Sequence, residues 1–94
     1  IVLFYTENKM VFVLDKEGRK YMCDRNLADL ETMLDNHNFF RANRQYIVNI
    51  SFIRGYKALE RVKLSVDLAC TDPHHSIVVS QETAPYFKKW LNEG

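Results

Sequence analysis

The apolar residues of this chain fall into short runs that are separated by polar turns. Runs of this length, rich in β-branched and aromatic side chains, are typical of β-strands. They predict strands at five places along the chain: residues 1–6, 10–14, 19–23, 46–50 and 77–79. Between the second and third of these strands, Asp15–Gly18 is predicted to be a hairpin loop in which Gly18 adopts a positive φ.

Residues 59–68 show a different pattern, in which apolar and polar side chains alternate. Val62, Leu64 and Val66 fall on one face of an extended segment, and charged or hydroxyl side chains fall on the other. A period of two residues is the pattern of a strand with one buried face, so we expect a single half-buried strand here. Residues 71–74, with a proline among them, then predict a turn.

A first short helix is indicated by leucines at helical spacing. Leu27, Leu30 and Leu34 recur at intervals of three and four residues, and the acidic residues among them point outward. Either Asp24 or Asn26 is a suitable N-cap for this helix.

A second helix is predicted over Thr83–Asn92. Pro85 fits only in a first helical turn, which places the cap near Thr83, and Phe87 and Leu91 form an apolar i,i+4 pair. With several strands, two short helices and no repeat or linker, the sequence predicts one domain over residues 1–94, of mainly β class with antiparallel sheets.

Composition narrows the class of protein. No stretch reaches the roughly 20 apolar residues of a membrane span, and no secretory signal pattern is present. Because the chain opens at Ile1 inside an apolar run, we interpret it as a piece of a longer protein. Cys23 and Cys70 lack the spacing of a zinc site and are too few for a disulfide scaffold, which favours a reduced pair in the cytoplasm.

The net charge of +1 is unevenly distributed along the chain. Residues 24–35 hold four acids and one arginine, or −3, whereas residues 41–63 hold six basic residues and one acid, or +5. The six basic residues are Arg41, Arg44, Arg54, Lys57, Arg61 and Lys63. This layout is a weak indication of an anionic partner at one face.

The densest polar cluster is Arg41–Gln45, between the aromatic pair Phe39–Phe40 and the strand predicted at residues 46–50. Its Arg44 side chain matches the two major-groove acceptors of guanine, and Asn43 and Gln45 carry amides that match adenine. A short loop between buried segments would present these groups rigidly. The alternative is an ordinary solvated turn.

Two other polar segments are candidates for the same surface. Thr6–Lys9 joins the first two strands, and Ser80–Thr83 precedes the second helix, where a helix N-terminus would favour a phosphate. In the alternative interpretation Ser80 or Thr83 is only a helix cap.

Candidate chemistry elsewhere is sparse. His74 and His75 are adjacent, point in different directions in an extended chain and lack a nearby third ligand, so we expect an exposed turn and no metal site. We expect His37 to be exposed as well. The sequence contains no phosphate-binding glycine loop, nucleophile elbow or zinc-protease motif. It therefore predicts neither an enzyme nor a cofactor.

Residues Phe39–Ile50 resemble the central signature of LytTR DNA-binding domains: two aromatics, Arg, a small or apolar residue, His or Asn, Arg or Asn, a polar residue, and an apolar strand with Asn near its end. Further segments agree with the family in order and spacing: Leu3–Asn8, Asn26–Leu30, Val78–Ser80 and Phe87–Leu91. The resemblance covers nearly the whole chain and implies one or two more strands upstream of Ile1.

What this resemblance implies is an elongated, mostly antiparallel β fold that reads double-stranded DNA through loops. The loops would enter successive major grooves of a bent duplex. By position, the base-reading residues map onto Asn43, Arg44 and Gln45 in the central loop, Asn8 or Lys9 in the early loop, and Gln81 in the late segment. Arg41 would serve the DNA backbone or the fold.

The sequence departs from the common family pattern at three of these positions. Asn43 stands where His is frequent, Gln45 where Ser is frequent and Gln81 where Arg is frequent. All three side chains still form hydrogen bonds, so we expect DNA binding with a different preferred base sequence and weaker attraction to phosphate at position 81.

The resemblance also implies a context: a bacterial, cytoplasmic transcription regulator of two-component signalling, whose upstream part is a receiver or another sensor domain. The isolated domain would be a monomer that forms a dimer on DNA and makes no membrane contact. Two other functions stay open. One is a β-rich protein-interaction module with Phe39, Phe40, Tyr46 and Tyr56 partly exposed as contacts, and the other is a binder of single strands by aromatic stacking. Fully exposed phenylalanines beside an Arg44 loop that is tucked inward would favour the interaction module.

Overall fold

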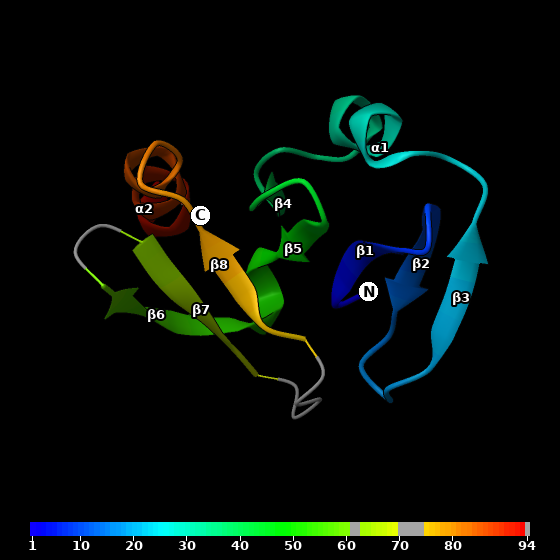
Figure 1. Cartoon of the computed structure of the whole chain (residues 1–94), viewed down its shortest axis with the longest axis horizontal. Helices are drawn as coiled ribbons and strands as arrows, with labels where there is room; N and C mark the ends of the chain where they lie inside the picture. The colour runs from blue at the N-terminus through cyan, green and yellow to red at the C-terminus, as the bar shows by residue number, and fades with distance from the viewer. Residues whose placement is uncertain (61–62, 70–74, 94) are drawn as a thin grey trace.

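The computed structural model describes residues 1–60, 63–69 and 75–93, which form two antiparallel sheets and two helices (Figure 1). The larger sheet has the order β3-β2-β1-β5-β4, with strands β1 Leu3–Glu7, β2 Met10–Leu14, β3 Lys20–Cys23, β4 Phe39–Arg41 and β5 Tyr46–Asn49. The smaller sheet has the order β6-β7-β8, with strands β6 Ile53–Leu59, β7 Lys63–Leu68 and β8 Ile77–Val79. Helices α1 and α2 span Leu27–Met33 and Ala84–Glu93, and the 3-10 turn η1 spans Ile50–Phe52. The extents are 35 × 27 × 24 Å.

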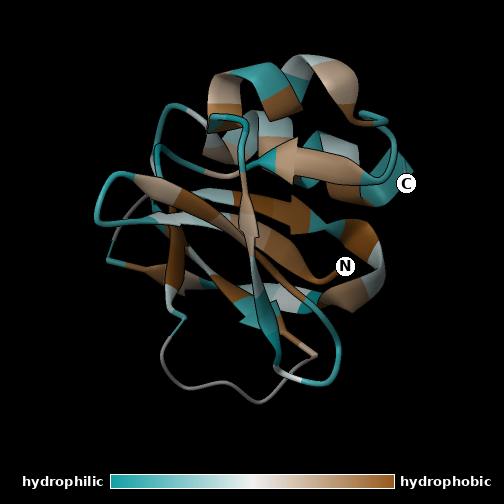
Figure 2. Cartoon of the chain, turned by 90° about the vertical axis from the view of Figure 1, so that its right-hand side faces the viewer, coloured by the Kyte–Doolittle hydropathy of each residue, from teal (hydrophilic) through white to brown (hydrophobic). Residues whose placement is uncertain are grey.

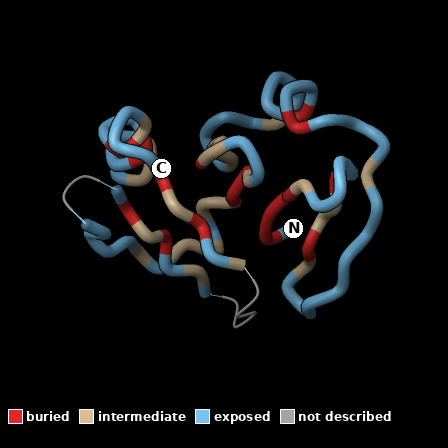
Figure 3. Tube along the Cα trace, viewed as in Figure 1, coloured by how far each residue is buried: buried red, intermediate tan, exposed pale blue. Residues whose placement is uncertain are grey.

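The larger sheet is buried on both faces along its central strands, which Figure 3 shows in red along β1. Leu3 and Tyr5 of β1 belong to the core shared with the smaller sheet and α2, whereas Phe4 between them belongs to a second core beneath α1. In β5, Val48 belongs to the first of these cores and Ile47 to the second. A strand buried on both sides has no polar face, which explains the unbroken apolar runs in the sequence and the hydrophobic colouring of the inner strands in Figure 2.

The smaller sheet corrects the prediction of one strand over residues 59–68. The chain instead turns after Leu59, and the β6–β7 hairpin closes with Leu59 opposite Lys63. Glu60 begins the turn at φ 55, a conformation that glycine usually supplies and that no glycine signals in this sequence. Leu64 and Val66 are buried on one face as predicted. The predicted roles of Arg61 and Val62 concern positions outside the described residues.

A second difference is β4, a strand that the pattern did not predict. Phe39–Phe40 was expected as an aromatic anchor and Arg41 as the first residue of a loop, but all three residues pair with β5. Phe39 then packs against Phe4 on one side, with ring centroids 5.9 Å apart, and Phe40 packs against Trp90 on the other, at 5.0 Å. Because tertiary contacts cover both faces, three residues suffice to hold this edge strand.

Helix α1 is capped by Asn26, one of the two candidates. The Asn26 side chain accepts a hydrogen bond from the backbone N–H of Asp29 at 2.8 Å. Leu27 and Leu30 are buried and Leu34 is half-buried at the end of the helix. The leucine spacing therefore predicted the buried face correctly.

We expect Asn26→Ala to destabilise the domain by about 1 kcal/mol, because one N–H of the first turn would lose its partner. Asp24→Ala is the matched control and should change stability by less than about 0.5 kcal/mol. Denaturant unfolding of both variants checks this. An equal loss in the two would mean that Asn26 is not the effective cap.

The β2–β3 hairpin turns through Asp15–Gly18, with Gly18 at φ 84 as predicted. The Asp15 carboxylate accepts hydrogen bonds from the backbone N–H groups of Arg19 and Glu17, both at 2.9 Å. The bond from the Arg19 N–H is the largest reason that the pKa of Asp15 lies below its usual range.

A lowered folded-state pKa means that the stability contributed by Asp15 is present above about pH 4 and is lost as pH falls through that lower pKa. Asp15→Asn keeps one acceptor oxygen but cannot titrate. We therefore expect the stability of this variant to fall less steeply than that of the native domain below about pH 4, measured by urea unfolding at several pH values. Parallel pH profiles would contradict this role of Asp15.

The histidines give a mixed result. His37 is exposed as expected, but His75 is half-buried and not in an exposed turn. Its ring packs against Tyr5 with centroids 4.5 Å apart, and its Nδ1 lies 3.0 Å from the hydroxyl of Tyr46. The contact partners lie on the other sheet, so local sequence could not reveal them. His74, Cys70 and the turn predicted at residues 71–74 lie outside the described residues.

Within the part of the chain that the structure describes, no group of three or more His, Cys, Asp or Glu side chains could hold a metal ion. Cys23 is a half-buried free thiol. None of the helices described is long and apolar enough to cross a membrane.

Candidate nucleic-acid interface

The three polar segments selected from the sequence lie on one side of the molecule. In the view of Figure 1 the β1–β2 turn, the β4–β5 loop and the segment between β8 and α2 are all on the upper side, whereas the β2–β3 turn is at the bottom. We call them the early turn (residues 8–9), the central loop (residues 42–45) and the late segment (residues 80–83). Segments that are far apart in sequence can therefore contact one extended partner together.

The early turn is a two-residue hairpin closed by the pair Glu7 and Met10. Asn8 and Lys9 both have positive φ, at 53° and 67°, which is the backbone of the tight turn that matches the twist of paired strands. Both residues are exposed. Their side chains point into solvent and are not part of the core.

The early turn and the central loop line one open groove, together with the first turn of α1. The backbone N–H of Thr6 donates to the carbonyl oxygen of Gln45 at 3.0 Å, which fixes the two segments side by side. The groove residues that belong to the helix are Asn26, Leu27 and Ala28. Their proximity to the loops was not predicted, because it follows from the packing of α1 on the sheet and leaves no local signal.

Arg41 supports the backbone of the central loop. Its guanidinium donates to the carbonyl oxygens of Asn43, at 3.2 Å, and Arg44, at 3.4 Å, and it lies 3.3 Å from the Glu31 carboxylate of α1. The side chain is half-buried. Arg41 therefore fixes the course of the loop backbone through two hydrogen bonds, and its contact with Glu31 holds the guanidinium in place.

Asn43 is also engaged within the protein. Its Oδ1 accepts hydrogen bonds from the backbone N–H groups of Gln45 and Tyr46, at 2.8 and 3.1 Å, and its Nδ2 donates to the carbonyl oxygen of Val78 in β8 at 2.9 Å. Asn43 is half-buried and the next residue, Arg44, is exposed. The amide thus closes the loop and ties it to the other sheet.

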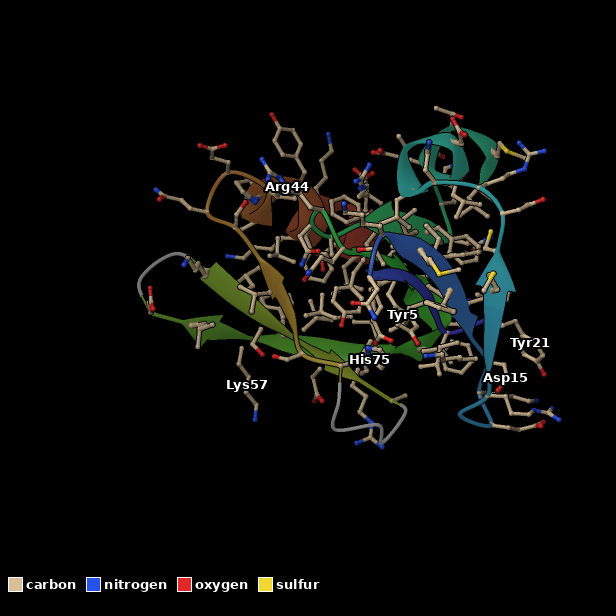
Figure 4. All side chains as sticks on the ribbon, turned by 45° about the vertical axis from the view of Figure 1, so that its right-hand side comes forward. Tyr5, Asp15, Tyr21, Arg44, Lys57 and His75 are labelled. Atoms are coloured by element: carbon tan, nitrogen blue, oxygen red, sulfur yellow. The ribbon has the colours of Figure 1, made fainter. Side chains whose placement is uncertain are left out.

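Arg44 and Gln45 differ from these two supports. Both are exposed, and neither side chain has a hydrogen bond or ion pair with the described residues. Figure 4 shows Arg44 on the upper side of the molecule. The loop backbone is held by hydrogen bonds, and the Arg44 and Gln45 side chains are exposed. Such a loop can present a guanidinium and an amide to a partner at low entropic cost.

The late segment places Gln81 in an exposed turn directly after β8. Ser80 holds this turn, since its hydroxyl accepts from the Thr83 N–H at 3.3 Å and its carbonyl accepts from the Ala84 N–H at 2.8 Å. Helix α2 then begins at Ala84, with Pro85 in its first turn as predicted. Ser80 and Thr83 are occupied with the helix start, which leaves Gln81 as the outward polar group that the sequence selected.

The basic residues that the structure describes in segment 41–63 do not form one face, which corrects the simplest interpretation of the segment's charge of +5. In Figure 4 Arg44 lies on the upper side, whereas Lys57 of β6 points away from the lower side. The acidic helix α1 lies beside the central loop and not opposite it, as the Glu31–Arg41 contact shows. The early turn, the central loop and the late segment together hold two basic residues, Lys9 and Arg44, and one acid, Glu82, for a net charge of +1.

Three of the four aromatic residues named for the alternative functions are half-buried and pack within the fold. Phe39 and Phe40 are half-buried, and each packs against a core ring. Tyr46 is half-buried as well and contacts His75, whereas Tyr56 is 39% exposed, as the alternative expected, and packs edge-on against Phe87. Because Phe39 and Phe40 are half-buried and Arg44 is exposed, the structure does not favour the alternative of a protein-interaction module.

The fold and the candidate site together define a mostly β domain that presents polar side chains on the loops between its strands. The family model of the LytTr DNA-binding domain matches residues 1–92. The chain thus belongs to the LytTR DNA-binding domain family, which confirms the resemblance found in the sequence, and this membership supports DNA binding.

Among solved structures, the chain is similar to the LytTr DNA-binding domain of a Bacillus cereus protein described as a methyl-accepting/DNA response regulator. The TM-score is 0.81 and the identity 24%, over 97% of this chain and 80% of the other. At this identity the similarity concerns the fold, and it confirms the predicted class of antiparallel sheets with two helices. No curated protein matches the chain.

Proposed function

We propose that this domain binds double-stranded DNA at a specific base sequence and thereby regulates transcription. The observation that carries the proposal is the central loop, in which Arg44 and Gln45 are exposed above a backbone that Arg41 holds. A guanidinium and an amide that are held in this way match guanine and adenine edges in a major groove. The loop, unlike a solvated turn, has a fixed course.

The early turn and the late segment are proposed to contact DNA on either side of the central loop. Lys9 would contact phosphate, since a flexible ammonium acts as a point charge, and Asn8 lies beside it with an amide that can reach a base or phosphate. Gln81 would reach a neighbouring groove. In this arrangement the loops enter successive major grooves, and the duplex bends to meet them.

The proposed context is a cytoplasmic regulator with an upstream receiver or sensor domain. An isolated module with few phosphate contacts has a low affinity, and two copies on adjacent sites raise it by raising the effective concentration. We therefore propose that the isolated domain is a monomer and that two domains bind one operator.

Selection of bound duplexes from a randomised DNA pool tests this function. We expect a short enriched motif with native protein, and loss of one defined position with Arg44→Ala. A folded protein that enriches no motif, as the isolated domain and when fused to a dimerising module, would contradict specific DNA binding.

A further inference from the structure

We infer that Asn43 is a positioning residue, which sets the spacing between the DNA contacts of the central loop and those of the late segment and does not itself read a base. The inference rests on the proposed DNA binding. It reverses the role that family resemblance assigns to position 43, and its basis is the set of hydrogen bonds that this asparagine makes.

The amide of Asn43 has little left to offer a base. An asparagine that reads adenine uses Oδ1 and Nδ2 together, as one acceptor and one donor on the same edge. Here Oδ1 already accepts two backbone N–H groups, and Nδ2 donates to the carbonyl of Val78. Turning the amide toward DNA would leave the partly buried Tyr46 N–H and Val78 carbonyl without this partner.

The bond to Val78 joins two segments that the shared hydrophobic core also holds together, and it adds a directional hydrogen bond between them. Residues 43 and 78 are 35 positions apart in sequence; Asn43 is in the loop that joins β4 and β5 of the larger sheet, and Val78 is on β8 of the smaller sheet. Tyr46, whose N–H is bonded to Asn43, carries the second link, because its hydroxyl lies 3.0 Å from Nδ1 of His75. The segment 75–78 is thus bonded to residues 43–46 at two places: Val78 to Asn43 and His75 to Tyr46.

The consequence concerns the two DNA contacts next to these links. Arg44 follows Asn43 directly, and Gln81 lies three residues beyond Val78. While the Asn43–Val78 hydrogen bond is present, the distance between Arg44 and Gln81 is fixed. One added base pair shifts a site by about 3.4 Å along the duplex axis and rotates it by about 34°, which a rigid pair of contacts cannot follow.

The test uses the motif selected by the native domain. Arg44→Ala and Gln81→Ala first assign the base pairs that depend on each side chain. Affinity is then measured for the selected duplex and for one with a base pair inserted between the two positions. The ratio of the two affinities cancels any uniform effect of a variant, such as an unfolded fraction or an added charge.

For the native domain we expect the insertion to lower affinity on the order of 10- to 100-fold. In Asn43→Ala the penalty should fall to within about threefold. Asn43→Asp keeps acceptors for Gln45 and Tyr46 but lacks the donor to Val78, so it should show the same reduced penalty. The matched control is Asn49→Ala, which removes an amide bonded to the Ile1 carbonyl at 2.6 Å and should keep the full penalty.

Two results would overturn the inference. If Asn43→Ala lost preference at one base pair and kept the full insertion penalty, Asn43 would be reading a base. If Asn43→Asp kept the full penalty, the bond to Val78 would not set the spacing. A native domain that selects no motif would instead refute the proposed function, and the inference with it.

Discussion

Replacement of Arg44 by alanine should lower affinity for the selected duplex by on the order of 1–3 kcal/mol and remove the preference at one base pair. The reason is that Arg44 is exposed, has no partner among the described residues and is carried by a loop whose backbone Arg41 fixes. Titration of native and variant domains with the selected duplex and with duplexes substituted at each position measures both effects.

The matched control is Lys9→Ala in the early turn. Lys9 is exposed as well, but a phosphate contact carries no sequence information, so its loss should weaken binding to all duplexes equally and lower the salt dependence. If Arg44→Ala behaved like Lys9→Ala, with equal losses on selected and random DNA, Arg44 would be a phosphate contact and the proposed readout would be wrong.

The second large effect is on stability. Phe87→Ala should destabilise the domain by about 3–5 kcal/mol, because this ring is fully buried and its removal leaves a cavity. Phe87 contacts Phe40, Tyr56 and Trp90, which come from β4, β6 and α2. A domain of this size has a total stability of roughly 5–14 kcal/mol, so a large part of it depends on this one side chain.

Tyr86 provides the control, since it is the neighbouring aromatic residue on α2 and is 70% exposed. Tyr86→Ala should change the free energy of unfolding by no more than about 0.5 kcal/mol. Equilibrium unfolding in urea measures both variants. Similar small losses would show that α2 does not close the core between the sheets.

The fold could be predicted from sequence where hydrophobic pattern and local geometry agree. The β1, β2 and β5 runs, the leucines of α1 and Pro85 at the start of α2 each carry their own signal. The turn at Glu60 does not, because a charged residue adopts a positive φ there under the constraint of the paired strands. The strand β4 was also missed, since three residues are too few to show a period.

The candidate interface could be predicted as a set of loops but not as an arrangement. Residue type and family resemblance selected the early turn, the central loop and the late segment, and the structure brings them to one side of the molecule. The distinction between Arg44, which is exposed, and Asn43, which is bonded to Val78, is invisible in sequence because the partner lies 35 positions away. The half-burial of His75 was missed for the same reason.

The central claim is that the domain distinguishes one duplex sequence from others. The most direct measurement is a fluorescence anisotropy titration at about 150 mM salt with the selected duplex, a scrambled duplex of the same composition and the single strand of the selected sequence. We predict the tightest binding to the selected duplex, by on the order of 10³ over the scrambled one when two domains are joined. Equal affinity for the two duplexes, or tighter binding to the single strand, would contradict the account.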